Sequence, residues 1–326
     1  MKKSAPPRKS SPLVSIVIPV FNEAESIPLL VDELNSVLKV LPYNFEIIFV
    51  DDGSTDQSFD LVRELQQNDR RIKALSFSRN FGHQAALTAG LQYAWGNAVI
   101  TMDADLQHPP SLIPSLLEKW GEGYKIVFTT REATADEPFL KKLTSRMFYR
   151  LINAFSETPV QTFGADFRLL DQSVVKNLNT LEERDRFLRG LIGWMGYPSI
   201  GVPFTAGPRA AGTSKYSTRK MFKLALDGLL SFSAEPLHFV TYLGLLVSFL
   251  SFLYGVYSIY AYFFTSRTIP GWTSILVTVL FLGGVQLISI GFLGEYLIRV
   301  YNEAKGRPLF IIKDSVGIDT SRPTSS

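Results

Sequence analysis

Two aspartates that follow an apolar run are the residues of this chain whose type and spacing best suit a metal ion. The stretch ITMDADLQHPP, residues 100–110, places Asp103 and Asp105 two positions apart at the predicted tip of a strand. Because alternate residues of a strand point to the same face, both carboxylates project together. At about 4 Å and an effective dielectric near 20, two such charges repel by roughly 4 kcal/mol. A divalent cation is the simplest group that offsets this repulsion.

The segments that must position these carboxylates alternate between strands and helices. Short runs rich in β-branched and aromatic residues predict buried strands at 14–21, 45–52, 72–78, 98–105 and 124–130. Apolar residues at spacings of three and four predict helices at 26–41, 55–70 and 82–96. This alternation predicts an α/β fold with a mainly parallel sheet, whose ligands bind at the carboxyl ends of the strands.

Polar residues gather at those carboxyl ends. They are Asn22-Glu23, Asp51-Asp52, Arg79-Asn80, Asp103-Ala104-Asp105 and Thr130-Arg131. The segment DDGSTD taken alone fits helix capping as well as ligand binding, because Asp and Ser are common N-cap residues. Together on one edge, the acidic groups predict a cleft that binds a polar ligand with a metal.

Composition excludes several other kinds of site. The chain has 326 residues, 46% of them hydrophobic, a formal net charge of +3 and no cysteine, so disulfides and thiolate metal sites are excluded. Its basic residues do not form one stripe, so nucleic acid is not an expected partner. Neither GxxxxGK[ST] nor a GxGxxG after a strand is present. A phosphate-bearing ligand would therefore be neutralised by the cation and by Arg131, Arg209 and Lys215.

Two long segments without charged residues, 239–264 and 272–293, predict transmembrane helices. At 1.5 Å per residue, each is long enough to cross a hydrocarbon core of about 30 Å. The basic residues that flank the pair are Arg219, Lys220, Lys223, Arg299, Lys305 and Arg307, whereas the connecting loop carries only Arg267. This bias predicts an integral membrane protein with both termini and the preceding domain on the cytoplasmic side. Two buried helices of a soluble protein are the alternative.

Several motifs in order resemble the family 2 glycosyltransferases. They are IPVFNEAESI, VDDGSTD, RNFGHQAALTAGL, MDADLQHPP, TTR and GTSKYS, and they span roughly residues 12–232. They most resemble the polyprenyl phosphate glycosyltransferases, which include dolichol phosphate mannose synthase, and GEYLIRVYNEAKGRP resembles their bacterial glucosyl branch. The resemblance implies a Rossmann-like sheet of the glycosyltransferase A type, followed by interfacial amphipathic helices and two transmembrane helices.

The resemblance also implies roles for individual residues. Nucleotide- and phosphate-binding positions would be Pro19, Phe21, Glu23, Asp51, Asp52, Asp103, Ala104, Arg131, Arg209 and Lys215. The metal ligands would be Asp103, Asp105 and Gln107, and the ion Mg²⁺ or Mn²⁺, which both accept hard oxygen ligands. Catalytic roles would fall to Asp105, Arg131 and Asp166.

The attacking group implied by the resemblance is a lipid monophosphate. Its second pKa is about 6, so it is mostly deprotonated at neutral pH and has little need of a strong general base. Asp166, in GADFRLLD, is the candidate base or orienting group, although an ion pair with Arg168 or a helix cap would explain it equally well. His83 and His108 are expected to be structural.

The chain is thus expected to comprise five parts. They are a flexible basic tail (1–11), a nucleotide-sugar-binding catalytic domain (12–214), a juxtamembrane amphipathic helix (215–235), a two-helix transmembrane domain (236–300) and a cytoplasmic C-terminal tail (301–326). Residues 139–155 and 215–232 mix basic residues with an apolar face, which favours helices that lie on an anionic membrane surface. Amphipathic helices packed on the sheet are the alternative.

The implied reaction is a metal-dependent, inverting transfer of a sugar from a nucleotide sugar to polyprenyl phosphate in the bacterial inner membrane. UDP-glucose is the expected donor, with UDP-N-acetylglucosamine, GDP-mannose and a UDP-aminoarabinose derivative left open. A processive polysaccharide synthase is an alternative, but its Gln-x-x-Arg-Trp motif is absent. A non-catalytic nucleotide-sugar-binding scaffold is another. Gly283, Gly284, Gly291 and Gly294 would allow close helix packing in a homo-oligomer.

Overall fold

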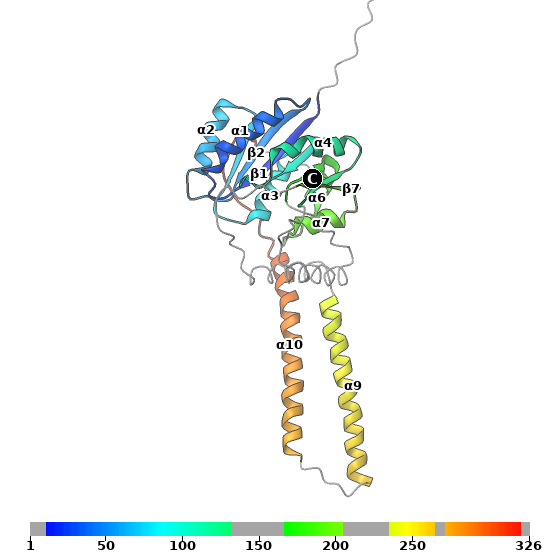
Figure 1. Ribbon diagram of the computed structural model, residues 1–326. Helices are drawn as coiled ribbons and strands as arrows, with labels where there is room; N and C mark the ends of the chain where they lie inside the picture. Colours follow the sequence, from blue (N-terminus) through cyan, green and yellow to red (C-terminus); the bar gives the residue numbers. More distant parts are fainter. Residues whose placement is uncertain (1–10, 132–165, 185, 205–234, 265–270, 321–326) are drawn as a thin grey trace, which may run out of the picture. The chain divides into compact units, whose positions relative to one another are not determined.

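The computed structural model describes residues 11–131, 166–184, 186–204, 235–264 and 271–320, and it divides the chain into two units. The first unit is an α/β domain, and the second contains two long helices (Figure 1). The strands are β1 (Leu13–Val20), β2 (Asn44–Asp51), β3 (Ile72–Phe77), β4 (Ala98–Thr101), β5 (Ile126–Arg131), β6 (Arg168–Asp171), β7 (Ser199–Phe204) and β8 (Ile312–Val316). The helices of the first unit are α1 (Ser26–Leu38), α2 (Ser58–Asn68), α3 (His83–Gln92), η1 (Pro110–Leu112), α4 (Ile113–Gly121), α6 (Gln172–Thr180) and α7 (Leu188–Trp194).

The eight strands form one mixed sheet in the order β7-β5-β6-β4-β1-β2-β3-β8. The pairs β1/β2, β1/β4, β2/β3 and β5/β7 are parallel, while β6 runs antiparallel between β4 and β5. The mainly parallel sheet predicted from the alternation is therefore confirmed. The expected fourth strand is shorter than predicted, because β4 ends at Thr101 and a loop carries Asp103 and Asp105.

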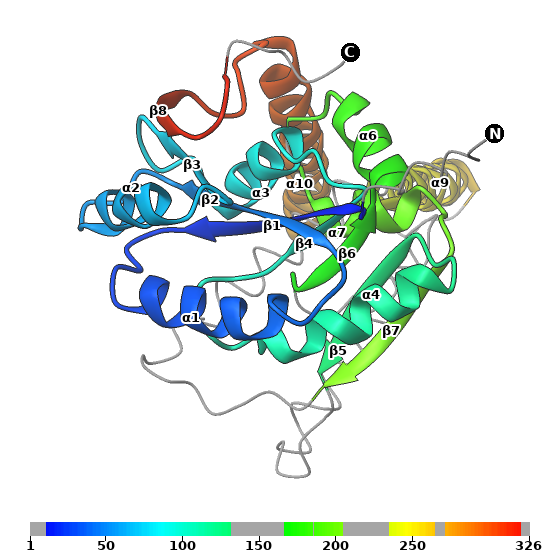
Figure 2. The ribbon, with the colours of Figure 1, turned by 90° about the horizontal axis from the view of Figure 1, so that it is seen from above.

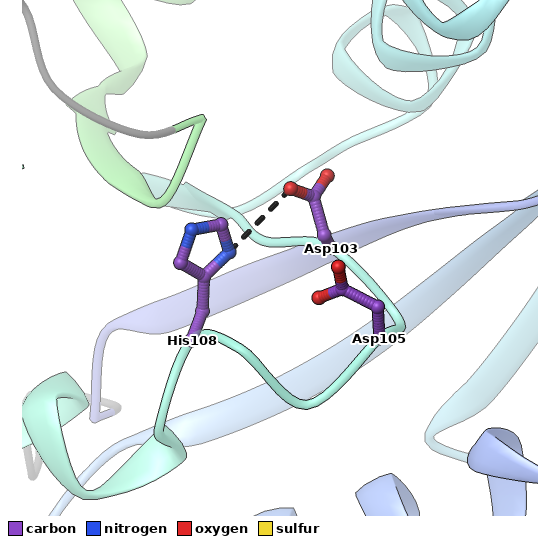
Figure 3. Close-up of side chains that lie close together, drawn as sticks. All are labelled: Asp103, Asp105 and His108. Atoms are coloured by element: carbon purple, nitrogen blue, oxygen red, sulfur yellow. Dashed lines mark ion pairs between the residues drawn. The ribbon is translucent and has the colours of Figure 1, made fainter. Parts of the chain in front are cut away.

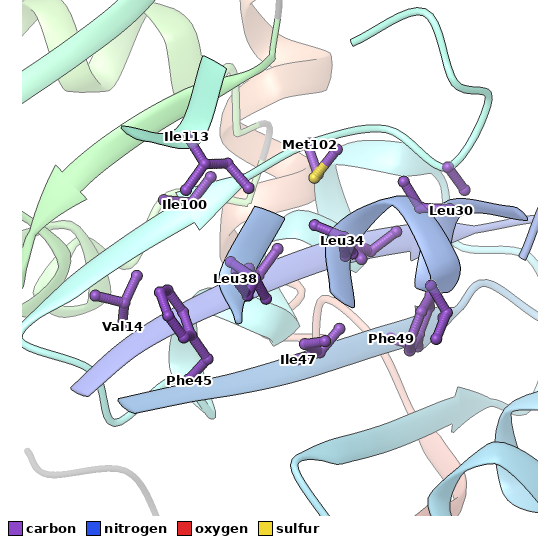
Figure 4. Packing of buried hydrophobic residues seen from close by; sticks show 14 of the residues in the cluster. Val14, Leu30, Leu34, Leu38, Phe45, Ile47, Phe49, Ile100, Met102 and Ile113 are labelled. Atoms are coloured by element: carbon purple, nitrogen blue, oxygen red, sulfur yellow. The ribbon is translucent and has the colours of Figure 1, made fainter. Parts of the chain in front are cut away.

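Helices cover both faces of this sheet. Figure 2 shows α1 and α4 on one face and α3 and α6 on the other. On α1, Leu30, Leu34 and Leu38 recur every four residues and are buried, so they form one apolar stripe. This stripe packs over β2 residues such as Ile47 and Phe49 (Figure 4). Each such side chain contributes about 1.5–3 kcal/mol when fully buried, which makes this core a rigid base for the loops at its edge.

The residues after the second long helix return to the sheet instead of forming the expected tail. β8 pairs antiparallel with β3, and the Phe310 ring stacks on Phe77 with centroids 5.0 Å apart. The Arg63 guanidinium also bonds Asp314 at 2.6 Å. The physical reason is that β3 would otherwise be an edge strand with unpaired N–H and C=O groups, which β8 satisfies. The first unit therefore includes a segment that the expected domain boundary at residue 214 left out.

The second unit contains α9 (Glu235–Phe264) and α10 (Trp272–Ala304), which contact each other. Each contains a window that is long and apolar enough to cross a membrane, by length and composition alone. Apolar side chains in both helices are exposed, among them Leu245, Phe249 and Ile290. The two helices predicted from charge-free runs are thus present as helices. The expected tail at 1–11, the interfacial helix at 139–155 and the juxtamembrane helix at 215–235 lie almost wholly outside the described residues.

Candidate active site

Parallel pairing brings the carboxyl ends of β1, β2, β3 and β4 to one edge of the sheet, where hydrogen bonds join the loops. The Asn22 side-chain oxygen accepts the Thr55 N–H at 2.8 Å. The Asp52 carboxylate accepts the N–H groups of Phe81 and Gly82 at 2.7 and 2.9 Å. The gathering of polar residues that the strand ends predict is therefore confirmed, and it is held by side-chain to backbone bonds between neighbouring loops.

Gly53 allows two of these loops to approach closely. Its φ is +71°, a left-handed conformation that side chains with a Cβ rarely adopt. A Cβ at this position would also lie 2.5 Å from the carbonyl carbon of Arg79. The glycine of the DDGSTD segment is therefore needed for the contact between the loops after β2 and β3.

The predicted nucleotide-pocket residues lie on this edge and also support its local structure. Pro19 is buried in β1, whereas Phe21 is 45% exposed. Glu23 accepts a hydrogen bond from the Ser26 hydroxyl at 2.6 Å, and Asp51 accepts one from Ser76 at 2.7 Å. Hydrogen bonds to neighbouring hydroxyl groups therefore occupy part of these carboxylates, and their contact with a nucleotide stays a prediction.

The loop after β4 brings Asp103, Asp105 and His108 together (Figure 3). One ligand atom from each lies within 4.8 Å of the others, and His108 Nδ1 is 3.5 Å from an Asp103 oxygen. The loop can turn back because Leu106 adopts a φ of 59°, while the Gln107 N–H donates to Asp105 at 3.1 Å. His108, expected to be structural, thus joins the predicted pair of aspartates.

This cluster fits a divalent cation. The His108 ring is 7% exposed and packs against Phe167 and Phe204, yet its Nδ1 has no hydrogen-bond partner within the described part of the chain. Burial, and then the nearby Asp166 and Asp105 charges, raise the pKa of Asp103. A cation bound here would stabilise the ionised carboxylate and use the imidazole nitrogen, and two carboxylates with one imidazole suit Mn²⁺ or Mg²⁺.

Asp166 reaches the same edge because β6 runs antiparallel beside β4, so its first residue, Arg168, lies opposite Thr101. The Asp166 carboxylate accepts hydrogen bonds from Arg168 at 2.9 Å and from Arg189 at 2.9 and 2.7 Å. His83 Nε2 lies 3.4 Å from Asp166 and 3.6 Å from Asp103, so it spans the two carboxylates. The ion pair with Arg168 that the sequence offered as one explanation of Asp166 is confirmed.

The surroundings of Asp166 oppose a role as a general base. Burial disfavours its charged form, but hydrogen bonds from His83 and Arg189 and the charge of Arg168 lower its pKa far below the ordinary range. Burial also lowers the pKa of Arg168, to about 10, so this guanidinium stays charged at neutral pH. A carboxylate this weakly basic is a poor proton acceptor near pH 7, and the geometry favours the orienting role.

The side chains of the three predicted phosphate-binding residues lie outside the described part of the structure. Arg131 ends β5, and only its backbone is described, while Arg209 and Lys215 lie outside the described residues. His83 and Arg189 were not predicted as site residues. His83 begins a helix after the third strand, which is a visible signal, but nothing local marks Arg189 as a neighbour of Asp166.

Comparisons with known proteins find a matching family and relatives that align with most of the chain. Residues 15–178 match the family described as Glycosyl transferase family 2. The uncharacterized glycosyltransferase YkcC of Bacillus subtilis is 44% identical over 308 residues, which are 94% of this chain and 95% of that protein. The bactoprenol glucosyl transferase of Shigella phage SfII is 43% identical over 302 residues, 93% of this chain and 98% of that protein.

Among solved structures, the mannosyltransferase PcManGT of Pyrobaculum calidifontis, in complex with GDP-Man and Mn²⁺, is 18% identical to this chain. The match covers 92% of this chain and 88% of that one, with a TM-score of 0.47. The family match and the two sequence relatives show the family directly. This chain belongs to the family 2 glycosyltransferases and has the mainly parallel α/β sheet of the glycosyltransferase A type.

Proposed function

We propose that this chain transfers glucose from UDP-glucose to the phosphate of an undecaprenyl-type polyprenyl phosphate. The observation that carries the proposal is the cluster of Asp103, Asp105 and His108 at the carboxyl edge of a family 2 glycosyltransferase sheet. The acceptor and sugar are supported by relatives named bactoprenol glucosyl transferase, which align with this chain over 98% of their own length.

The proposed reaction is a single displacement. An oxygen of the lipid phosphate attacks the anomeric carbon, the bond from that carbon to the UDP oxygen breaks, and UDP leaves with the electron pair. Attack from the opposite face gives a β-linked product from an α-linked donor. Because a phosphate monoester with a pKa of about 6 is already mostly deprotonated, no strong base is needed. The very low pKa of Asp166 is compatible with this chemistry.

Within this proposal, Asp103, Asp105 and His108 would hold Mg²⁺ or Mn²⁺ against the donor diphosphate. The bound cation would neutralise the charge that develops on the departing UDP. Asp51 and Asp52 lie at the end of β2, two strands away from β4 and its metal-binding loop, and they would face the nucleoside. Arg131, Arg209 and Lys215 complete the proposed set as phosphate-binding residues.

We further propose that α9 and α10 anchor the chain in the bacterial inner membrane with the catalytic unit on the cytoplasmic side. Support comes from their length, their apolar composition and their exposed apolar side chains. A polyprenyl phosphate presents its headgroup at the bilayer surface, so an enzyme that acts on it gains from being held there.

Label transfer tests the function. The purified full-length protein is incubated with radiolabelled UDP-glucose, Mg²⁺ and undecaprenyl phosphate, and the products are extracted with chloroform. The proposal expects label in a chloroform-soluble product. Water-soluble polymer would instead indicate a polysaccharide synthase, and binding of UDP-glucose without transfer would indicate a scaffold. Parallel reactions with UDP-N-acetylglucosamine, GDP-mannose and a UDP-aminoarabinose derivative test the choice of donor.

A carboxylate variant tests the metal assignment. Asp105→Asn should lower transfer by roughly 100-fold or more, because a cation contributes several kcal/mol of charge stabilisation. Asp60→Asn is the matched control, since Asp60 is an exposed aspartate on α2. EDTA should abolish transfer and added Mn²⁺ restore it. Near-normal turnover of Asp105→Asn, or full activity in EDTA, would contradict the assignment.

A further inference from the structure

The cluster around Asp166 holds more positive than negative charge. One carboxylate accepts hydrogen bonds from two guanidinium groups, so Asp166, Arg168 and Arg189 together carry a surplus of one positive charge. The rest of this edge carries Asp51, Asp52 and the aspartates of the metal-binding loop. An anion that approaches such an edge is repelled by the carboxylates and attracted by this cluster.

The two guanidinium groups differ in what they can reach. The Arg168 side chain is 3% exposed, so a ligand cannot touch it and would feel only its electrostatic potential. The Arg189 side chain is 38% exposed, and the Asp166 side chain between them is 10% exposed. Within this cluster, Arg189 is therefore the guanidinium that a ligand can touch.

The orientation of Arg189 is fixed before any ligand binds. Its Nε and one terminal nitrogen donate to the two oxygens of Asp166, which is a bidentate pair. A guanidinium carries five N–H groups in one plane, so those on its other edge point away from Asp166. The start of α7 is held in turn by the Leu188 N–H, which donates to the Gln84 side chain of α3 at 3.1 Å.

The order of the strands separates this cluster from the nucleotide end of the site. Along the sheet the order is β2, β1, β4 and β6, so Asp51 and Asp52 lie at one end, the metal-binding loop in the middle and Asp166 beyond it. His83 spans the short gap from Asp103 to Asp166. In the proposed reaction the sugar diphosphate is bound at the metal and the nucleoside lies toward Asp51 and Asp52. The attacking phosphate must therefore approach the sugar from the other side of the metal-binding loop, where Asp166 lies.

On the basis of the function above, we propose that Arg189 binds the phosphate of the acceptor lipid and that Asp166 is its positioning residue. The guanidinium would hold the phosphate monoester beside the metal-binding loop and offset the repulsion from the aspartates. Asp166 fixes the plane of the guanidinium and does not itself touch the acceptor. The loss of activity expected from an Asp166 variant would then reflect a displaced arginine.

Kinetics of the full-length enzyme test the assignment, with Arg189→Gln and Arg189→Lys as variants. We expect the KM for undecaprenyl phosphate to rise roughly 10- to 100-fold in Arg189→Gln, because a charge-assisted hydrogen bond is lost. The KM for UDP-glucose should stay within about twofold. The KM of Arg189→Lys for undecaprenyl phosphate should lie between the values of wild type and Arg189→Gln. Lysine keeps the positive charge but not the planar, bidentate arrangement of N–H groups.

Arg71→Gln is the matched control. Arg71 makes the same kind of bidentate pair, with Asp69 at 3.0 and 2.6 Å, and is 43% exposed. It precedes β3 and so lies at the amino ends of the parallel strands, away from the proposed site. Both KM values should therefore be unchanged in Arg71→Gln.

A binding measurement separates the lipid headgroup from free phosphate and needs no turnover. Farnesyl phosphate should raise the melting temperature of the wild-type UDP–Mn²⁺ complex, and this gain should vanish in Arg189→Gln. Inorganic phosphate should produce a smaller gain, also lost in the variant, and farnesol none.

The outcomes distinguish this inference from the proposed function. An acceptor KM within about twofold of wild type in Arg189→Gln would overturn the inference, and so would an equal rise in the KM for UDP-glucose. Unimpaired protection of the variant by farnesyl phosphate would also overturn it. A wild-type enzyme that moves no label to polyprenyl phosphate would instead refute the proposed function.

Discussion

Replacing Asp166 with asparagine should destabilise the catalytic unit far more than an ordinary surface substitution. The variant keeps the size of the side chain but removes the charge that pairs with two guanidinium groups. Arg168, 3% exposed, donates to Asp166 at 2.9 Å, and Arg189, 38% exposed, donates at 2.9 and 2.7 Å. After the substitution, the buried Arg168 charge would remain without this carboxylate.

The buried pair dominates the expected loss. Removing one partner of a buried ion pair costs about 3–5 kcal/mol, because the other charge stays desolvated. The exposed Arg189 adds at most about 1 kcal/mol, since water screens it. A loss of about 3–5 kcal/mol corresponds to a fall in melting temperature of roughly 6–20 °C for a domain of about 200 residues.

Thermal unfolding of the full-length protein in detergent, followed by tryptophan fluorescence, measures this effect. Asp60→Asn is the control, because its ion pair with Arg63 spans 3.3 Å between side chains that are 70% and 43% exposed. That pair should contribute less than about 1 kcal/mol. The double variant Asp166→Leu/Arg168→Met should recover part of the loss by removing both buried charges. If Asp166→Asn melts within about 2 °C of wild type, the ion pairs of Asp166 with Arg168 and Arg189 do not stabilise the fold as argued here.

Three further predictions concern stability. Gly53→Ala should cost roughly 2–4 kcal/mol, because φ is +71° and the new Cβ would meet Arg79 at 2.5 Å; an unchanged melting temperature would contradict this. Burial opposes ionisation of Asp171, but its hydrogen bonds lower its pKa to about 2. The ionised Asp171 carboxylate therefore contributes roughly 1–2 kcal/mol, after solvent screening, to the free energy of unfolding. This contribution is complete above about pH 4 and is lost as the pH falls through about 2. Urea unfolding of Asp171→Asn should thus differ from wild type at pH 6 and converge with it near pH 2, and a constant difference would refute the pKa. Phe310→Ala should lower stability by roughly 1–3 kcal/mol through the lost stack on Phe77, with Phe310→Leu losing less; equal losses would argue against a stacking contribution.

The strands that the sequence predicted are those whose signal is local. β1 and β2 are nearly continuous apolar runs, and their burial on both faces follows from that composition. β6, β7 and β8 escaped prediction, and for β6 and β8 the reason is the opposite one. β6 has only four residues and begins and ends with the charged Arg168 and Asp171, and β8, IKDSV, has three polar residues of five. Pairing with β4 and β3, which no short window of sequence shows, makes them strands.

The same distinction between local sequence signals and tertiary contacts holds for the residues of the candidate site. The aspartates at 51, 52, 103 and 105 were recognisable because each ends or follows a strand, and parallel strands must place their carboxyl ends at one edge. His108 was harder to assign, since its distance from Asp103 depends on a loop that turns at Leu106. Gln107, the ligand that the resemblance implied, enters the described contacts through its backbone N–H.

By itself, the sequence determined the α/β class, the acidic edge, the two long apolar helices and the family, because each rests on periodicity, composition or contiguous motifs. The tertiary structure alone showed that Asp166 also pairs with Arg189 and that His83 lies between Asp166 and Asp103. It also decided that the chain end completes the sheet. Apart from the local pair of Asp166 and Arg168, such contacts join residues far apart in the sequence, because 104 positions separate Leu188 from Gln84 and 251 separate Arg63 from Asp314. Only the packing of whole elements brings these residues together.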